Sequence, residues 1–315
     1  MSELEWKICE YEGVRNLRVF NTLFIQSINH KGLGCFFKSE QIAFIPINFS
    51  YRFLERIYIS NSTIFISSHF KTKIIIETLI EFVNENKITL IVKGDYSIPL
   101  GSERVFKNYF EFGKKQTLIH NLHNEHEKWF SNIRKKHRYY SKKASTSCTC
   151  ETYTASDISK VQLKDIFEMH IFEMNRKQVT PLFKDFSAFL SFVESGKKNL
   201  FFNLCMIEND IVYFNLTHCV NDIANYIMAS SNNLGRSINA SYHGVSSTFK
   251  FFFSHSSIKY FNFGGIDKRL NPGGYFFKKG FAGQAISSPK LIIISQKRLV
   301  VLLFKISFLF KRRKI

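Results

Sequence analysis

Only six cysteines occur in the 315 residues of the chain, scattered at positions 9, 35, 148, 150, 205 and 219. The one close pair, Cys148 and Cys150, has neither the spacing of a zinc knuckle nor that of a redox pair. We therefore expect a reduced, metal-free protein of the cytoplasm that carries no permanently bound cofactor.

An apolar leader is also missing. The N-terminal segment MSELEWKICEYEGVRNL contains acidic residues and no apolar core, which predicts no secretory signal. Residues 291–310 are apolar, but Lys297, Arg298 and Lys305 interrupt them, and each cation costs roughly 2.5–3.5 kcal/mol at the centre of a bilayer. The apolar residues of the segment, at roughly 0.3–0.6 kcal/mol each, offset about that cost or less. A membrane span is therefore disfavoured.

The C-terminal segment, residues 290–315, has a second interpretation as a basic amphipathic tail. Its basic residues recur at helical spacing and leave Leu, Val and Phe on the other side: Lys297, Arg298, Lys305 and Arg312. Such a helix would lie at the inner face of the plasma membrane, with residues 311–314 against anionic headgroups. The alternative is a core strand over residues 291–294 followed by a docked helix. Both hold together if the strand closes a sheet and the helix touches the membrane.

Acidic residues are too few to balance the basic ones. Lys and Arg total 44 against 25 Asp and Glu, a formal net charge of +19, and the excess gathers in residues 128–143 and 290–314. This distribution predicts a polyanionic or membrane-surface partner. With 45% hydrophobic and 22% charged residues the chain is globular, and its length indicates one or two domains.

The first 116 residues have the pattern of an α/β unit without an obvious motif. Short apolar runs over residues 42–47 and 63–66 predict strands, and residues 88–92 predict a buried strand. Between them, residues 69–86 place apolar side chains at helical spacing: Phe70, Ile74, Leu79, Phe82 and Val83.

From residue 117 a second unit is expected. Its predicted elements are a strand over 117–122, one basic helix over 124–143, a strand over 148–154 and helices over 158–174 and 186–195, the first capped by Ser156 or Asp157. Residues 199–207, 211–218 and 223–229 then predict an antiparallel meander. A helix of about twenty residues follows and leads into a strand over 259–263 and a glycine loop. This order fits a GNAT-like acyltransferase domain.

Four segments carry a resemblance to a family. They are the run WFSNIRKKHR from Trp129, the predicted hairpin with Tyr226 and Ala229-Ser230-Ser231, the helix over 239–255, and the block from FNFGGI to FFKKGFAG. In this order they resemble the Fem-type (FemAB-like) branch of the GNAT acyltransferase superfamily, which includes the peptidoglycan bridge-forming aminoacyltransferases. The resemblance covers about residues 117–284.

The resemblance implies an α/β (α+β) fold of tandem GNAT-like domains, with mixed, mostly antiparallel sheets flanked by helices. The domains would be a diverged GNAT-like half over residues 1–116, a catalytic domain over 117–289 and the basic tail over 290–315. It also implies a transferase that moves an aminoacyl or acyl group onto an amine of a cell-envelope precursor, of peptidoglycan or of a surface polysaccharide.

Two departures from the family leave the donor open. The chain has no uninterrupted heptad run of the kind that forms the coiled-coil arm of tRNA-dependent members. It also lacks the Gln/Arg-x-x-Gly-x-Gly/Ala pyrophosphate loop, of which Asn233-Leu234-Gly235-Arg236 is at best a remnant. The donor is therefore either aminoacyl-tRNA, which the positive charge favours, or acyl-CoA or acyl carrier protein, which the missing arm favours.

Acyl transfer to an amine needs a cation or donor for the tetrahedral oxyanion and a group that handles the amine proton. The resemblance assigns the first role, or the grip on the donor's terminal phosphate, to Lys278, and stacking on the donor to Phe277. Gly264 and Gly265 would let the backbone approach a ligand. Asp267 would orient the amine, or else cap a turn.

Arg134 and Arg138 are predicted to share a helix face and grip the diphosphate of an undecaprenyl- or nucleotide-linked substrate. The resemblance places Tyr226 against the acceptor; the alternative is a tyrosine of the core. Two other functions stay open. One is an acyl-CoA-dependent N-acetyltransferase for a nucleotide- or lipid-linked amino sugar. The other is a non-catalytic basic module that binds nucleic acid.

Overall fold

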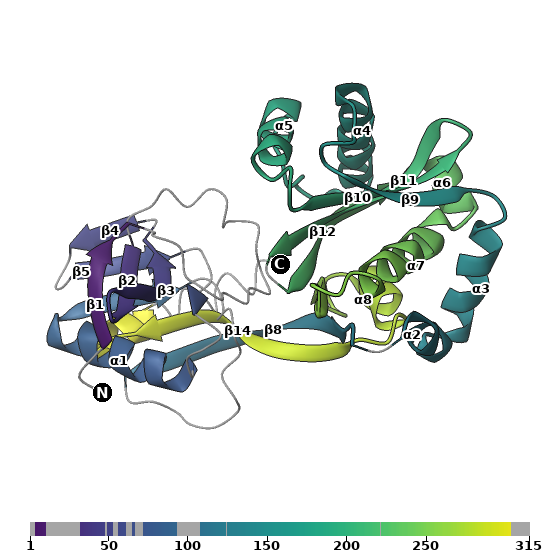
Figure 1. Ribbon diagram of the computed structural model, residues 1–315. Coiled ribbons are helices and arrows are strands. Elements are labelled where there is room, and N and C mark those ends of the chain that lie inside the picture. The colour runs from purple at the N-terminus through teal and green to yellow at the C-terminus, as the bar shows by residue number, and fades with distance from the viewer. Residues whose placement is uncertain are drawn as a thin grey trace. The chain divides into compact units, whose positions relative to one another are not determined.

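The computed structural model describes residues 4–10, 32–47, 49–52, 56–60, 65–66, 72–92, 108–123, 125–220 and 222–303. The chain divides into two compact units, Met1–Gln116 with Ser287–Ile315, and Thr117–Ile286 (Figure 1). It passes between them within two long strands, β8 (Tyr109–Asn121) and β14 (Gln284–Ile294).

The first unit contains two sets of paired strands. One has the order β1 (Leu4–Cys9), β2 (Gly32–Phe37), β3 (Glu40–Pro46) and β6 (Phe65–Ile66); the other has the order β4 (Phe49–Arg52), β5 (Arg56–Ser60), β7 (Ile88–Val92) and β14. Helix α1 (Thr72–Glu85) buries one apolar side among them: Ile75, Ile76, Leu79, Ile80 and Val83. The strand predicted over 88–92 is confirmed, and the helix predicted over 69–86 is confirmed from Thr72 onward; Phe70 lies outside the described residues.

The beginning of the C-terminal segment is a core strand. Ile292, Ile293 and Ile294 are fully buried and pair antiparallel with β7. A helical turn follows over residues 298–303, with Leu299, Leu302 and Leu303 more than half exposed. The alternative of a core strand followed by a helix therefore describes residues 291–303. Lys305 and Arg312, two of the basic residues of the predicted amphipathic tail, lie outside the described residues. Within the described ranges, no helix is long and apolar enough to span a membrane.

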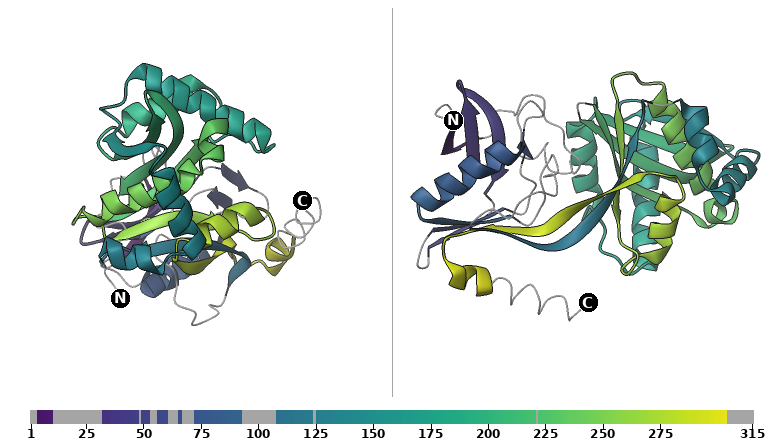
Figure 2. Two further views of the ribbon diagram at one scale, coloured as in Figure 1. Left: turned by 90° about the vertical axis from the view of Figure 1, so that its right-hand side faces the viewer. Right: turned by 90° about the horizontal axis from the view of Figure 1, so that it is seen from below.

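The sheet of the second unit has the order β8, β13 (Tyr260–Ile266), β12 (Ile223–Ser231), β11 (Asp210–Val220), β10 (Leu200–Ile207) and β9 (Thr149–Thr154). The predicted meander is confirmed, because β9 to β12 pair antiparallel in sequence, whereas β12 and β13 pair parallel. Helices α4 (Lys160–Arg176) and α5 (Phe186–Ser195) cover one face, and α7 (Ala240–Phe253) covers the other (Figures 1 and 2). Alternating strand residues supply a core to each face.

The single basic helix predicted over 124–143 is wrong. Two helices occupy that stretch, α2 (His126–Asn132) and α3 (Lys135–Ala144), with buried Ile133 in extended conformation between them. The guanidinium of Arg138 donates to the carbonyl oxygens of Ser131 and Ile133, which satisfies the backbone where α2 ends. Helical periodicity continues through this break, so it could not be seen in the sequence.

Two other helix boundaries also differ from expectation. Helix α4 is capped by Ser159, which forms a capping box with Gln162, while Asp157 accepts hydrogen bonds from Thr154. The helix expected after the meander is divided into α6 (Asn233–Ser237) and α7, because Asn239 adopts a left-handed conformation with φ of 62°.

The expectation of a fully reduced protein is wrong in the structure, where Cys150 and Cys205 form a disulfide. They are direct partners across β9 and β10 but 55 residues apart in sequence, so spacing along the chain could not reveal the pair. Cys148, the close neighbour singled out in the sequence, keeps a free thiol.

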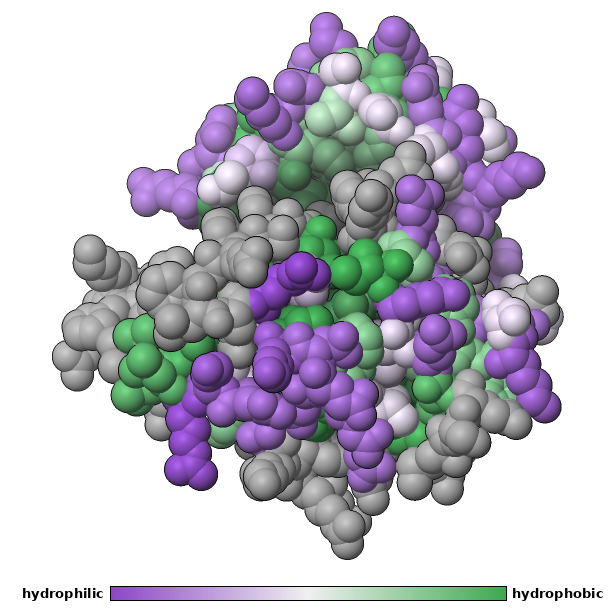
Figure 3. Space-filling model, turned by 90° about the vertical axis from the view of Figure 1, so that its left-hand side faces the viewer, coloured by the Kyte–Doolittle hydropathy of each residue, from purple (hydrophilic) through white to green (hydrophobic). Residues whose placement is uncertain are grey.

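One face of the described residues is largely polar. On the face shown in Figure 3, hydrophilic side chains (purple) cover much of that surface, and hydrophobic ones (green) lie in smaller groups between them. Basic side chains along α3 are exposed: Lys135, Lys136, Lys142 and Lys143.

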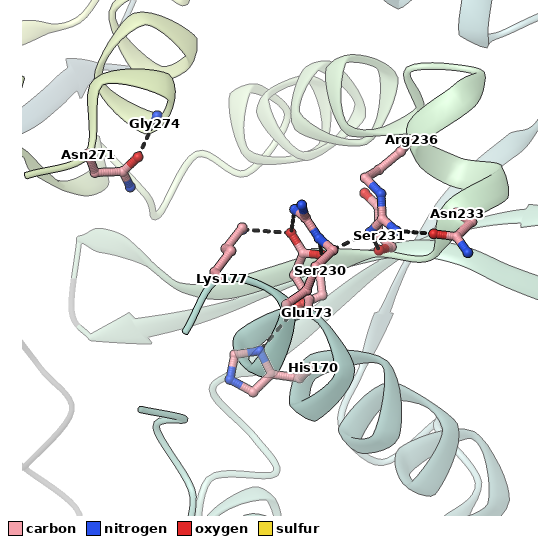
Figure 4. Close-up of polar contacts among 10 residues, drawn as sticks. His170, Glu173, Lys177, Ser230, Ser231, Asn233, Arg236, Asn271 and Gly274 are labelled. Carbon is pink, nitrogen blue, oxygen red and sulfur yellow. Dashed lines mark hydrogen bonds and ion pairs between the residues drawn. The ribbon is translucent and has the colours of Figure 1, made fainter. Parts of the chain in front are cut away.

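A buried carboxylate fastens α4 to the segment after β12 (Figure 4). The side chain of Glu173 is only 6% exposed. Its carboxylate oxygens form ion pairs with the side-chain nitrogens of Arg176, Lys177 and Arg236, each at 2.8 Å. Burial alone would raise the pKa of Glu173, but the hydrogen bonds and charges of Arg176 and Lys177 lower it to about 2. Arg236 also donates to the carbonyl oxygen of Ser231, so the cluster holds α6 against the end of the strand.

We expect Glu173→Gln to lower the free energy of unfolding by about 2 kcal/mol or more. This is less than the roughly 3–5 kcal/mol lost when a fully buried pair is broken, because Arg176 and Lys177 are half-exposed. The difference from wild type should be present above pH 4.5 and vanish as the pH falls towards 2, since the folded-state pKa is depressed from 4.5 to about 2. Urea denaturation as a function of pH measures it.

Glu168→Gln is the matched control, because the Lys164 to Glu168 pair on the same helix is 64% exposed on both sides. It should change stability by less than about 1 kcal/mol. Equal effects of the two substitutions would contradict the assigned role of Glu173.

Candidate functional site

Strands β12 and β13 are paired only at their beginnings. The parallel ladder joins Ile223–Asn225 to Tyr260–Asn262. The side chain of Asn262 forms two hydrogen bonds where this ladder ends. Its amide nitrogen donates to Asn225 Oδ1 and its amide oxygen accepts from the Gly264 N–H, both at 2.9 Å. Gly264 then adopts φ of +79°, a conformation that favours glycine. The chain therefore leaves the ladder at the predicted glycine pair.

Lys278 reaches this point from α8 (Pro272–Lys279). The helix begins at Asn271, whose side chain caps the Gly274 N–H at 2.8 Å (Figure 4). At its other end, Lys278 Nζ donates to the Gly265 carbonyl oxygen at 3.1 Å. The structure thus brings together Lys278, Gly264 and Gly265, three residues predicted from the sequence.

Two neighbouring aromatic rings lie to one side of the Lys278 ammonium. Nζ lies 5.6 Å from the ring centre of Phe263 and 5.9 Å from that of Tyr226, within the range of cation–π attraction. The side chain is half-buried, and this burial lowers the pKa of Lys278 to about 8. At neutral pH the group is mainly protonated, yet it is a stronger proton donor than an ordinary lysine.

The hydroxyl of Tyr226 belongs to a buried polar network. It lies 3.1 Å from the hydroxyl of Tyr213, which accepts from Asn215 Nδ2 at 3.2 Å; the same amide reaches Thr248 at 2.9 Å. Burial raises the pKa of Tyr226 well above 10 and that of Tyr213 to about 12, so both are neutral phenols. The Tyr226 hydroxyl therefore lies in the core, which was one of the two alternatives for this residue. Its ring lies near the Lys278 ammonium.

The C-terminal end of α8 is fixed by α3. His137 Nε2 donates to the Phe277 carbonyl oxygen at 2.9 Å, and the Arg134 N–H donates to the Gly280 carbonyl oxygen at the same distance. A side chain at Gly280 would come within 2.0 Å of the His137 ring, so glycine is required there. His137 was missed in the sequence, where only its place in the WFSNIRKKHR run could have drawn attention to it.

Phe277 lies inside an aromatic cluster. Its ring centre is 5.1 Å from Tyr242 and 5.2 Å from Phe281. Because the side chain is half-buried, one part of the ring stays accessible, and stacking on a donor stays a prediction.

Asp267 occupies the turn before α8. Its Oδ1 accepts from the N–H groups of Arg269 and Leu270 at 2.9 and 3.0 Å, which is the turn-capping role predicted as its ordinary explanation. A role for Asp267 toward an amine stays a prediction.

The guanidinium groups of Arg134 and Arg138 do not form one shared binding site in the structure. Arg134 stands before the first turn of α3 with an exposed side chain, whereas the Arg138 guanidinium is engaged by the Ser131 and Ile133 carbonyl oxygens. Neither residue contributes a side-chain hydrogen bond to the Lys278 site in the described part of the chain. Their grip on a diphosphate stays a prediction.

The remnant of a pyrophosphate loop has a structural explanation. A side chain at Gly235 would lie 2.0 Å from the Val212 carbonyl oxygen, so this glycine allows α6 to pack on β11. Its N–H is taken by the side chain of Asn232 at 2.8 Å.

No family model matches the chain, and no curated protein matches it. Solved structures do match. FemX superposes with a TM-score of 0.62 at 12% identity, over 86% of this chain and 89% of that one. L-PGS from Bacillus licheniformis gives 0.54 at 12% identity, over 89% of both chains. A tandem GNAT protein from the clavulanic acid biosynthesis pathway gives 0.50 at 7% identity, over 93% and 98%.

These similarities show the fold. It is a tandem GNAT fold, as the resemblance found in the sequence implied. In the second unit, the parting of β12 and β13 and the position of Lys278 define the candidate site.

We expect Gly264→Ala to lower the free energy of unfolding by about 1–3 kcal/mol, because its left-handed φ strains any other residue. Its new Cβ would also stand 3.4 Å from Lys278 Nζ. Gly273→Ala, in the first turn of α8 with nothing within 4 Å of its Cβ, is the control and should stabilise by up to about 1 kcal/mol. Thermal and urea denaturation measure both; a neutral Gly264→Ala would contradict the description of this turn.

Proposed function

We propose that the protein is a Fem-like N-acyltransferase that moves an aminoacyl or acyl group onto an amine of a cell-envelope precursor, of peptidoglycan or of a surface polysaccharide. The observation that carries the proposal is the Lys278 ammonium, half-buried beside two aromatic rings where β12 and β13 part. The tandem GNAT fold supports it.

Attack of an amine on the acyl carbon produces a tetrahedral oxyanion. One hydrogen of the Lys278 ammonium is used by Gly265, which leaves two that can donate to such an oxygen. The aromatic rings of Phe263 and Tyr226 keep water from that side, so the cation acts with less screening than at a surface. With a pKa near 8, Lys278 can also protonate the leaving group.

We assign the remaining predicted residues to the same reaction. Gly264 and Gly265 let a donor pass close to the backbone, and Phe277 offers the accessible part of its ring for stacking. Asp267, two residues beyond Gly265, orients the amine. Arg134 offers an exposed guanidinium to the phosphate of a lipid- or nucleotide-linked acceptor, while Arg138 acts through the end of α2.

Two classes of donor fit this site. The tandem GNAT neighbour is described with reference to AcCoA, which supports acyl-CoA. Another neighbour, the C-terminal domain of a putative lysylphosphatidylglycerol synthetase from Agrobacterium fabrum, is named for a lysyl lipid and supports an aminoacyl donor; its TM-score is 0.55 at 10% identity. The net charge of +19 favours a polyanionic donor such as aminoacyl-tRNA.

We further propose peripheral contact with the inner face of the plasma membrane. Leu299, Leu302 and Leu303 are exposed on the helical turn after β14, beside Lys297 and Arg298. Exposed leucines next to cations are the composition of an interfacial helix on anionic lipid. Lipid-linked acceptors would then be within reach of the protein.

Substitution of Lys278 tests the proposal in cells. Envelope glycans and muropeptides are compared by mass spectrometry in a deletion strain complemented with wild type, Lys278→Ala or Lys279→Ala. We expect the wild type to restore an aminoacyl or acyl mass that the deletion loses, and Lys278→Ala to transfer it roughly 10²–10³-fold more slowly, as when one oxyanion donor is removed.

Lys279→Ala is the matched control, since it removes a charge from the adjacent position of α8 and should restore the mass. Unchanged masses in every fraction would overturn the proposal and leave the basic nucleic-acid-binding module ahead. Full transfer by Lys278→Ala would refute the assigned role of this lysine but keep the reaction.

A further inference from the structure

Outside the candidate site, three cysteines gather on one face of the second unit's sheet. The sulfur atoms of Cys148, Cys150 and Cys205 lie within 4.8 Å of one another. Cys150 and Cys205 are direct partners across β9 and β10, and Cys148 stands two positions before Cys150, so an extended chain projects both to the same side. This grouping is a product of strand pairing and has no counterpart in the sequence spacing.

The surroundings of this cluster are apolar on one side and accessible on the other. Cys148 and Cys205 are buried with Val212, Tyr213 and Ala240. Cys150 is half-buried on β9, the strand at the edge of the sheet, so the group is less enclosed on this side. Cysteine sulfurs grouped in this way can serve as metal ligands as well as packing groups.

We propose that Cys148, Cys150 and Cys205, once the Cys150–Cys205 disulfide is reduced, bind Zn²⁺ through three thiolates, with water as the fourth ligand on the side of Cys150. Zinc–sulfur bonds of about 2.3 Å in a tetrahedral site place the sulfurs about 3.8 Å apart. Three sulfurs that already lie within 4.8 Å can reach this separation by side-chain rotation.

The chemistry balances with a thiol reductant. Two equivalents of the thiol convert the disulfide into the Cys150 and Cys205 thiols and leave as their own disulfide. Zinc then displaces one proton from each of the three cysteines. Because these protons are released on binding, zinc should bind more tightly as the pH rises.

The zinc-bound state and the disulfide-bonded state exclude each other. Substitution of Cys148 affects only the zinc-bound state. This residue takes no part in the disulfide, yet it is required for the metal. Its thiol lies 3.4 Å from the Ala144 carbonyl oxygen, at the end of α3. A bound zinc would therefore tie the turn between α3 and β9 to the sheet.

The test uses the full chain, reduced and freed of reductant without oxygen, and titrated with Zn²⁺ against a chromophoric chelator. We expect one ion per chain, with affinity about tenfold or more weaker in each of Cys148→Ala, Cys150→Ala and Cys205→Ala. Cys219→Ala, a buried free cysteine outside the cluster, should bind as wild type. Co²⁺ in place of Zn²⁺ should show thiolate-to-metal charge-transfer absorption that the three variants lose.

Cys148→Ala keeps both disulfide partners, so its oxidised form reports whether the variant folds. Absence of stoichiometric binding by the reduced wild type would overturn the proposal. Wild-type affinity in folded Cys148→Ala would overturn it as well. Neither result bears on acyl transfer, which is tested separately at Lys278.

Discussion

The hydrogen bond from Lys278 to the Gly265 carbonyl oxygen is the interaction on which the candidate site depends. It forms because Asn262 ends the ladder between β12 and β13, and because Gly264 can adopt a left-handed φ beside it. Without that turn the strands would continue side by side, and α8 would have no carbonyl to reach. The same turn sets the ammonium beside Phe263 and Tyr226 in a partly buried position, and this burial lowers its pKa.

The position of α8 in turn depends on polar contacts at both of its ends. Asn271 caps the start, and His137 on α3 holds the Phe277 carbonyl oxygen at the end. Helix α3 can deliver His137 only because the chain turns at Ile133, where the Arg138 guanidinium replaces the missing helical hydrogen bonds. The basic run that suggested a phosphate grip in the sequence therefore also serves to align the helix that carries the lysine.

Much of the fold could be predicted from the sequence, because strand alternation and helical spacing are local properties. The meander, α1 and β7 are examples, and the glycine pair with Lys278 could be recognised by its residue types. The breaks at Ile133 and Asn239, the Cys150–Cys205 disulfide and the Glu173 cluster could not. The disulfide and the Glu173 cluster depend on partners far along the chain, such as Arg236, which lies 63 residues from Glu173. The two breaks depend on local details that helical spacing does not show: the contact of Arg138 with Ile133 and the φ of Asn239. The backbone contacts of Arg138 could not be predicted from its residue type either.

The most direct test is an NMR titration of the Lys278 ammonium in the folded protein, with lysine labelled at Nζ and Lys278→Arg used to assign the signal. We predict a pKa of about 8 for this group, well below the ordinary value of 10.5, and the exposed lysines in the same spectrum serve as the internal control. A Lys278 signal that titrates near 10.5 would contradict this prediction, because a fully solvated lysine would lack the partly desolvated environment on which the proposed catalysis rests.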